Sequence, residues 1–473
     1  MIIHGIQARG AAAGQATLLR RNGIAVLLLV AAGSYAAAHP AGGEPGLPGM
    51  ETHRIEEPVF NGRVAVYEAG RGKGRAILLV HGIGADGARD YSDQIAWLRE
   101  SFHVIALDLP GFGQSDKSDA LYTPANYVGV LKHVADRFLQ RPFVLVGHSL
   151  GALVSLRYAA TYPGDVEKLV VMSVPGVLHR HATTSRYLAG LMGVSPSEFE
   201  SLSWLGRLPG KLLTPLERLG VDPYGVLADP QHREGLLNGD PANIAGLAAA
   251  IDDLQQELPS VQAETLIIWG GEDAIAPLRN GRVLARTLSR ARLEVIEDAA
   301  HTPMMETPGR LRTVLEPFLE HGLPAPAPGP AAVMPQNGEA RCRRERDRIF
   351  EGGFDVLVLE SCHNVRIRNA RVRALRILSS TVTIDDSHIG GGRTGMLVRS
   401  STVVMTGGRI EGTVAISAYA SRLDLAAVDL EGREAAVKAM KRSYVVFSLS
   451  RLKSPYTEGL MHDFVTVTDR NPR

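Results

Sequence analysis

GHSLG occupies residues 147–151, between the apolar run PFVLV at 142–146 and the helix-forming stretch at 152–160. This order predicts a buried strand, a sharp turn at Ser149 and a helix, which is the pattern of a nucleophile elbow. The flanking glycines leave room for a strained turn, and the helix N-terminus offers backbone donors to a developing anion. Ser149 is therefore the predicted nucleophile.

An acid and a histidine follow the serine in the order that serine catalysis on this pattern requires. Asp273 comes after the predicted strand 264–269 and a Gly-Gly-Glu break, which puts a carboxylate on a loop at the end of a strand. His301 follows another predicted strand and could take the Ser149 proton, while Asp273 fixes its tautomer. Glu272 is the alternative acid, although a shift of one residue would aim its side chain elsewhere.

A glycine-rich loop upstream supplies candidate anion donors. The predicted strand 76–80 leads into His-Gly-Ile-Gly at residues 81–84. The backbone amide of Ile83, paired with the amide of Leu150 after the nucleophile, is predicted to form the oxyanion hole.

With these motifs the chain resembles the α/β-hydrolase superfamily over roughly residues 53 to 320, and the turn DLPGFGQS at 108–115 adds to the likeness. The resemblance implies an α/β fold, and the alternation of predicted strands and helices indicates a mostly parallel sheet. About 85 residues separate two successive predicted strands, more than one crossover helix needs, so a helical cap is predicted at about 177–260. Dehalogenases and epoxide hydrolases of this fold carry an aspartate where this chain has Ser149. Three kinds of reaction remain open. They are hydrolysis of esters, thioesters or amides, perhydrolase-like activity, and cleavage of a carbon–carbon bond in a diketone-like substrate.

Composition excludes other classes of function. The chain has 51 basic and 50 acidic residues in 473, so its net charge of +1 favours no nucleic-acid partner. It contains no H-E-x-x-H, C-x-x-C or P-loop motif and only two cysteines. We therefore expect no cofactor and no metal.

The N-terminus resembles an export signal. Basic residues precede an apolar run of about 16 residues that ends in Ala-Ala-Ala, so 1–38 is predicted to be a signal peptide, with 39–52 as a flexible leader. The protein is then periplasmic or extracellular. An uncleaved N-terminal membrane anchor and a cytoplasmic product starting at Met50 are the alternatives.

The remaining boundaries follow from composition. The hydrolase domain is expected at 53–321 and a proline-rich linker at 322–340. A repeat domain is expected at 341–456 and a C-terminal tail at 457–473.

The repeat domain is defined by five pairs of apolar residues spaced 17, 21, 20 and 22 residues apart. A small or polar residue lies two positions before each pair: His363, Ser380, Ser401, Ser421 and Ser443. Periods near 20 with alternation of two are typical of stacked coils. The segment resembles the right-handed β-helix of the pectate-lyase-like superfamily, with a small antiparallel β domain as the alternative.

The sequence favours a binding or structural role for this domain. Its alternating arginines are most simply explained as a solvated face. A binding role would involve a glycan or a partner protein. Cys342 and Cys362 lie about one coil apart, so an exported protein could join them in a disulfide. The oligomeric state is not given by the sequence.

Together these features predict an exported serine hydrolase that acts through an acyl-enzyme on a small or medium carboxylic ester. Two alternatives stay open. One is a carbon–carbon bond hydrolase of diketone-like substrates, and the other is a glycan-binding or surface-binding protein with a vestigial hydrolase core.

Overall fold

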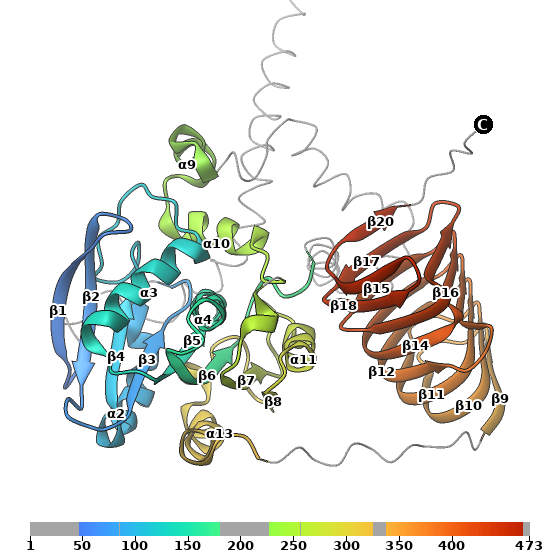
Figure 1. Cartoon of the computed structure of the whole chain (residues 1–473), viewed down its shortest axis with the longest axis horizontal. Helices are drawn as coiled ribbons and strands as arrows, with labels where there is room; N and C mark the ends of the chain where they lie inside the picture. The colour runs from blue at the N-terminus through green and yellow to red at the C-terminus, as the bar shows by residue number, and fades with distance from the viewer. Residues whose placement is uncertain (1–46, 85, 180–226, 256, 325–336, 467–473) are drawn as a thin grey trace, which may run out of the picture.

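The computed structural model describes residues 47–84, 86–179, 227–255, 257–324 and 337–466 (Figure 1). In these ranges no helix is both long and apolar enough to cross a membrane.

Several predicted segments fall wholly or partly outside the described residues. They are the signal or anchor at 1–38, most of the leader, the middle of the predicted cap at 180–226, most of the linker, and the end of the tail.

An eight-stranded sheet forms the first part of the fold, in the order β1-β2-β4-β3-β5-β6-β7-β8. β3 to β8 are parallel, β2 is antiparallel to β4, and β1 is antiparallel to β2. The strands are β1 (Glu51–Glu57), β2 (Gly62–Ala69), β3 (Ala76–Val80), β4 (His103–Asp108), β5 (Phe143–His148), β6 (Val166–Met172), β7 (Glu264–Gly270) and β8 (Ala291–Ile296). The predicted mostly parallel sheet is confirmed.

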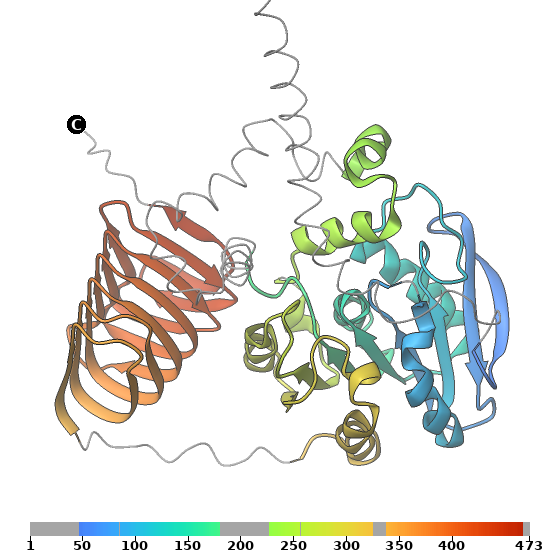
Figure 2. The same ribbon diagram turned by 180° about the vertical axis from the view of Figure 1, so that it is seen from behind.

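Helices cover both faces of this sheet because its central strands are apolar on both sides (Figure 2). Leu78 and Val80 pack beneath α3, α4 and α11, whereas Ile77 and Leu79 pack beneath α2 and α13. The helical segments are η1 (Gly87–Tyr91), α2 (Ser92–Ser101), α3 (Pro124–Phe138), α4 (Leu150–Thr161), α9 (Pro230–Leu237), α10 (Pro241–Ile251), η2 (Leu258–Ser260), α11 (Leu278–Thr287), α12 (Pro303–Glu306) and α13 (Pro308–His321).

α10 lies over the carboxyl ends of the parallel strands. Asp240 caps it by accepting a hydrogen bond from the amide of Ala242 at 2.7 Å. Its residues approach Gly111, which follows β4, and Gly176, which follows β6. The described part of the predicted cap therefore lies beside the edge of the sheet that carries the functional loops.

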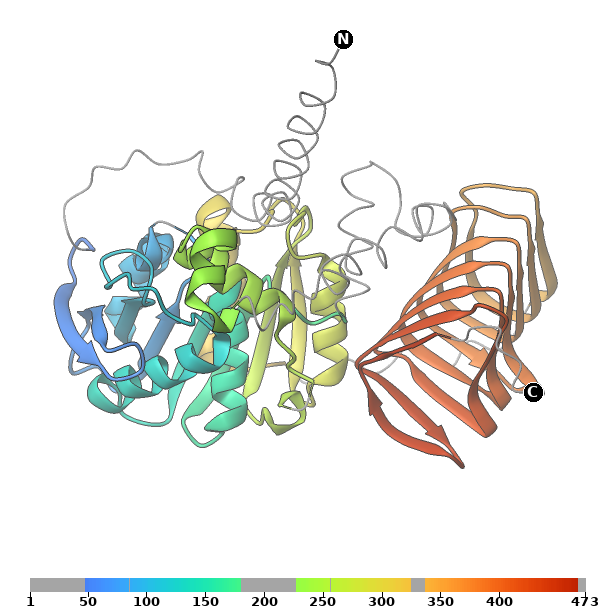
Figure 3. The same cartoon turned by 90° about the horizontal axis from the view of Figure 1, so that it is seen from above.

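The second part is a stack of mostly parallel strands wound into coils, which runs from β9 to β20 (Figure 3). Corresponding apolar residues of successive coils lie in register and fill one core. The strands are β9 (Asn337–Arg343), β10 (Ile349–Glu360), β11 (Val365–Leu378), β12 (Thr381–Gly390), β13 (Thr394–Arg399), β14 (Thr402–Tyr419), β15 (Arg422–Ala426), β16 (Asp429–Met440), β17 (Tyr444–Ser448), β18 (Ser450–Ser454), β19 (Thr457–Met461) and β20 (Phe464–Thr466).

A ladder of serines joins the coils. The backbone amide of Ser380 donates to Ser401 Oγ at 3.0 Å, the amide of Ser401 to Ser421 Oγ, and the amide of Ser421 to Ser443 Oγ. Each of these hydroxyls also donates to a carbonyl oxygen two or three residues earlier. In the first coil the donor to Ser380 Oγ is the amide of Cys362, at 2.9 Å, one residue before His363.

The ends of this domain differ from the predicted bounds of 341–456. β9 begins at Asn337, inside the predicted linker, because its residues pair in parallel with β10. β19 and β20 lie in the predicted tail, where they pair antiparallel with β18 and β17. Both strands are short, with five and three residues, yet each of them covers an otherwise open strand edge.

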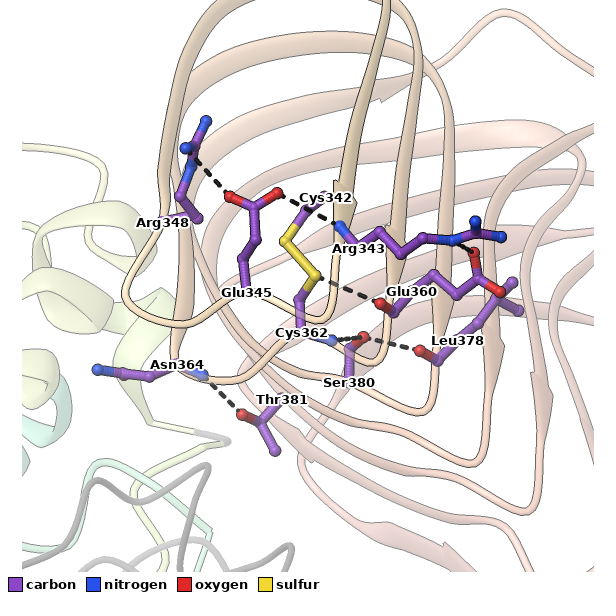
Figure 4. The surroundings of a disulfide bond; sticks show 10 residues. All are labelled: Cys342, Arg343, Glu345, Arg348, Glu360, Cys362, Asn364, Leu378, Ser380 and Thr381. Carbon is purple, nitrogen blue, oxygen red and sulfur yellow. Dashed lines mark hydrogen bonds and ion pairs between the residues drawn. A yellow bond between two sulfur atoms is a disulfide. The ribbon is translucent and has the colours of Figure 1, made fainter.

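A disulfide joins Cys342 to Cys362 at the first coil (Figure 4). Both residues are buried in the apolar core of the domain. The bond ties β9 to the turn between β10 and β11.

Candidate active site

Ser149 is the single residue between β5 and α4, and it has a strained backbone conformation with φ 49° and ψ −117°. Positive φ is rare outside glycine and costs about 1–3 kcal/mol, which surrounding contacts must offset. A Cβ at Gly147 would lie 2.4 Å from the carbonyl oxygen of Gly151, and one at Gly151 would lie 2.3 Å from that of Val80. The flanking glycines are therefore required by close packing around the turn.

Three of the predicted residues come together at the carboxyl ends of their strands. His301 Nε2 lies 3.2 Å from Ser149 Oγ, and His301 Nδ1 lies 3.0 and 3.1 Å from the two carboxylate oxygens of Asp273. Ser149 is half-buried, whereas the Asp273 side chain is fully buried. This arrangement can relay a proton from the hydroxyl to the imidazole and stabilise the resulting imidazolium.

The loop after β7 fixes the Asp273 carboxylate. Its Oδ1 accepts hydrogen bonds from the backbone amides of Ile275 at 2.9 Å and Ala276 at 2.8 Å. The carbonyl oxygen of Ala276 in turn accepts from Trp269 Nε1 at 2.7 Å. The alternative acid, Glu272, is exposed and has no hydrogen bond to His301 among the described contacts.

The predicted oxyanion loop passes directly against the nucleophile. A Cβ added to Gly82 would lie 2.9 Å from Ser149 Cβ, so only glycine fits there. Ile83 follows in the same loop and is half-buried. Leu150 is the first residue of α4, where a backbone amide has no acceptor within the helix. Both predicted donors thus belong to segments that border Ser149.

Two buried histidines support the site without taking part in the Ser149–His301–Asp273 contacts. His148 Nε2 donates to the carbonyl oxygen of His301 at 2.8 Å. His81 Nδ1 donates to the carbonyl oxygen of Gly82, and its Nε2 accepts from the amide of Leu109. Burial holds the pKa of each imidazole below its usual value, so both stay neutral.

Glu306 is a supporting residue that the sequence analysis missed. Its carboxylate accepts from the amides of Ala300 and Thr302, the two neighbours of His301. It also accepts from the Thr302 hydroxyl at 2.7 Å. The Thr-Pro-Met-Met-Glu spacing at the start of α12 is the signal that could have indicated this clamp on the His301 loop.

One group of side chains in the described residues has the composition of a metal site, at the edge of the sheet. Glu51, His53 and Glu68 place potential ligand atoms within 4.8 Å of one another. Arg71 contacts both carboxylates and already supplies a cation to them. Glu68 also contacts His103, and with Arg71 as the largest cause its pKa falls to about 2.

Comparisons with known proteins give a consistent result. Residues 77–314 match the pattern of the alpha/beta hydrolase family. An uncharacterized protein of Mycobacterium tuberculosis is 30% identical over 274 residues, which cover 54% of this chain and 78% of that protein.

Two further similarities are lower in identity. The monoacylglycerol lipase ABHD6 of Mus musculus is 25% identical over 262 residues, covering 52% of this chain and 75% of the lipase. The structure of a thermophilic esterase from Thermogutta terrifontis aligns with a TM-score of 0.41 at 24% identity, covering 57% of this chain and 98% of the esterase.

Proposed function

Since the chain belongs to the alpha/beta hydrolase family, we propose that it is a serine hydrolase that cleaves carboxylic esters through an acyl-enzyme. One observation supports this activity above the others: the Ser149 hydroxyl, the His301 imidazole and the Asp273 carboxylate form a continuous chain of contacts of 3.2 and 3.0 Å. The similarity to a monoacylglycerol lipase supports an ester as the substrate.

In the proposed reaction, Ser149 Oγ attacks the acyl carbon while His301 Nε2 takes the hydroxyl proton. The charge that develops on the carbonyl oxygen is stabilised by the backbone amides of Ile83 and Leu150. His301 then gives the proton to the leaving alcohol. A water molecule, deprotonated by the same imidazole, releases the acid and regenerates Ser149.

Asp273 has a separate role in this scheme. Its carboxylate accepts the Nδ1 proton of His301, which leaves Nε2 free to act as the base. Because the carboxylate is buried and held by two amides, the imidazole is oriented before a substrate binds. Glu306 and His148 hold the backbone around His301 from two further sides.

We further propose that the protein is exported, to the periplasm or the cell exterior. The Cys342–Cys362 disulfide supports this location because disulfides persist in oxidising compartments. The basic and apolar pattern of residues 1–38 supports it as well.

The activity is tested with a series of nitrophenyl esters of increasing acyl length, using the full chain and Ser149→Ala. We expect hydrolysis by the wild type and a loss of at least about 10⁴-fold in kcat/KM for the variant. Ser118→Ala, at an exposed serine outside the site, is the matched control and should keep full activity. Hydrolysis that survives Ser149→Ala, or a folded wild type that cleaves only diketones, would contradict the proposed activity.

A further inference from the structure

On one outward face of the β-helix, the exposure of the side chains changes from the first coils to the later ones. Strand residues alternate between the core and the outside, and one outward column runs Arg366, Thr383, Val404, Asp424, Val446 through five coils in register. Along this column Arg366 is exposed and Thr383 half-buried, whereas Val404, Asp424 and Val446 are 2–3% exposed. The outward face of the later coils is therefore covered by other parts of the protein.

The hydrolase domain provides that cover. Ala426, Val446 and Leu449 of the β-helix belong to the same apolar cluster as α4, α10 and α11. The segment after β6 takes part: the amide of His179 donates to Ser448 Oγ at 2.9 Å. Figures 1 and 2 show α11 as the helix of the hydrolase domain that faces the coils.

At the centre of this contact, Arg279 of α11 forms a buried ion pair with Asp424. Their side chains are 5% and 3% exposed, and Arg279 Nη2 lies 3.0 Å from Asp424 Oδ1. The guanidinium also donates to Thr406 Oγ1 at 2.7 Å and to the carbonyl oxygen of Met405 at 2.8 Å. A fully bonded, planar guanidinium fixes both the position and the orientation of the helix that carries it.

Two more arginines extend the contact along the same face of α11. Arg282 and Arg286 lie three and seven residues after Arg279, so they project from one side of the helix. Arg282 pairs with Asp385 at 3.9 Å, and Arg286 contacts Asp386. Gly407 makes room, since a Cβ at that residue would collide with the Arg286 side chain. Side chains of β12, β14 and β15 thus all hold one helix.

α11 is directly connected to the candidate acid. The loop that begins at Asp273 enters α11 at Leu278, and both amides that hold the carboxylate belong to this short loop. Asn280, the third residue of α11, donates from Nδ2 to the carbonyl oxygen of Val174 at 3.0 Å, which links α11 to the segment after β6. A shift of α11 would therefore move the loop that orients His301.

We infer that the β-helix is a buttress of the active site, and that Arg279 and Asp424 are positioning residues that hold the Asp273 loop through α11. This inference rests on the proposed hydrolase activity. It assigns the C-terminal domain a role within the enzyme, in place of an independent binding module joined by a linker.

The test measures turnover per active site in the full chain, with active sites counted by a fluorophosphonate probe. Asp424→Asn is compared with Asp429→Asn, a matched change at an exposed ion pair with Arg451 on the same domain. We expect kcat per site to fall at least tenfold for Asp424→Asn with little change in KM, since displacements of about 1 Å cost about 100-fold in rate. Asp429→Asn should behave as the wild type.

The pH profile separates positioning from a general loss of stability. A displaced Asp273 stabilises the imidazolium less, so the acid limb of kcat/KM should move to lower pH in Asp424→Asn. An unchanged kcat per site and an unchanged acid limb would overturn the inference, whatever happens to Tm.

A second variant covers the case in which Asp424→Asn does not fold. Arg279→Leu combined with Asp424→Leu leaves no unpaired buried charge, and such replacements are often well tolerated. We expect this double variant to fold and to show the same loss of kcat per site. Wild-type turnover in the double variant would overturn the positioning role.

Failure of the inference is distinguishable from failure of the proposed activity. An inactive wild type would contradict the activity alone. The docking is then tested by inserting a protease site at Gly329 in the linker and cutting the purified chain. We expect the two parts to co-elute on gel filtration, and their separation would overturn the buttress.

Discussion

The eight-stranded sheet and the β-helix are both built mainly from parallel strands, yet only the sheet brings reactive side chains together. In the sheet, long connections separate successive strands, so loops of unrelated sequence meet at one edge and supply Ser149, Asp273 and His301. In the β-helix, each coil lies in register on the next, so like residues stack and form the serine ladder. Convergence of different loops provides chemistry, and repetition provides a regular framework.

The largest expected effect concerns the loops that meet at the edge of the eight-stranded sheet. Asp273→Asn keeps the shape of the acid but offers His301 the wrong hydrogen-bonding partner, so kcat should fall about 10³- to 10⁴-fold. Steady-state kinetics with a nitrophenyl ester measures this. Glu272→Gln, one residue away and exposed, should stay within twofold of the wild type. Equal losses of kcat in the two variants would contradict the assignment of Asp273 as the acid that orients His301.

A buried acid close to the oxyanion loop makes the hydrolase domain sensitive to pH. Burial, with Asp86 and Asp108 nearby, raises the pKa of Asp90 to about 7. The folded chain then holds this proton between about pH 4 and 7 while the unfolded chain has lost it, so stability falls as pH rises through that window. At pH 8 the penalty is fully present.

Asp90→Asn removes this titration. The variant should be as stable as the wild type near pH 4 and more stable at pH 8, by up to about 4 kcal/mol if the pKa of Asp90 is raised to about 7. Urea unfolding at the two pH values measures the difference. The exposed Asp93→Asn should keep the wild-type slope, and a wild-type slope in Asp90→Asn would rule out Asp90 as its source.

A substitution at Gly151 tests whether the close approach of the loops around Ser149 requires a glycine. Gly151→Ala places a Cβ 2.3 Å from two carbonyl oxygens, so we expect a loss of about 1–3 kcal/mol in the free energy of unfolding. Activity per folded molecule should fall as well, because the collision pushes against the oxyanion loop. Gly164→Ala, with open space around it, is the matched control. Similar results for the two would contradict the close packing.

The smallest expected effect concerns the repetitive side. Ser401→Ala leaves the buried amide of Ser380 without its acceptor, which costs about 1–2 kcal/mol of stability. Thermal unfolding measures the loss, and kcat per active site should stay as in the wild type if the coils remain docked. Ser417→Ala, at a half-buried position of β14, the strand that begins just after Ser401, should change stability by less than about 0.5 kcal/mol.

Local pattern was sufficient to predict the elbow, the order of the three site residues and the inward apolar pairs of the coils. Each of these depends on neighbours in sequence or on a repeat. Glu306 was missed because its clamp needs the turn at His301 to exist first. β19 and β20 were missed because they are only five and three residues long and lie outside the repeat.

The docked face could not be predicted from the sequence for a different physical reason. The outward arginines of β11 are exposed, as expected for a solvated face. Val404 and Asp424 occupy equivalent positions two and three coils later, where both are buried and Asp424 pairs with Arg279 of α11. A single sequence carries no signal that relates an arginine at 279 to an aspartate at 424.

The central claim is that the converging loops make Ser149 a nucleophile. We would label the purified full chain with a fluorophosphonate and map the adduct by peptide mass spectrometry. One adduct per chain, on Ser149, with no labelling of Ser149→Ala and greatly slowed labelling of His301→Gln, is the predicted result. A folded chain with no adduct, or with the adduct on another residue, would contradict the account.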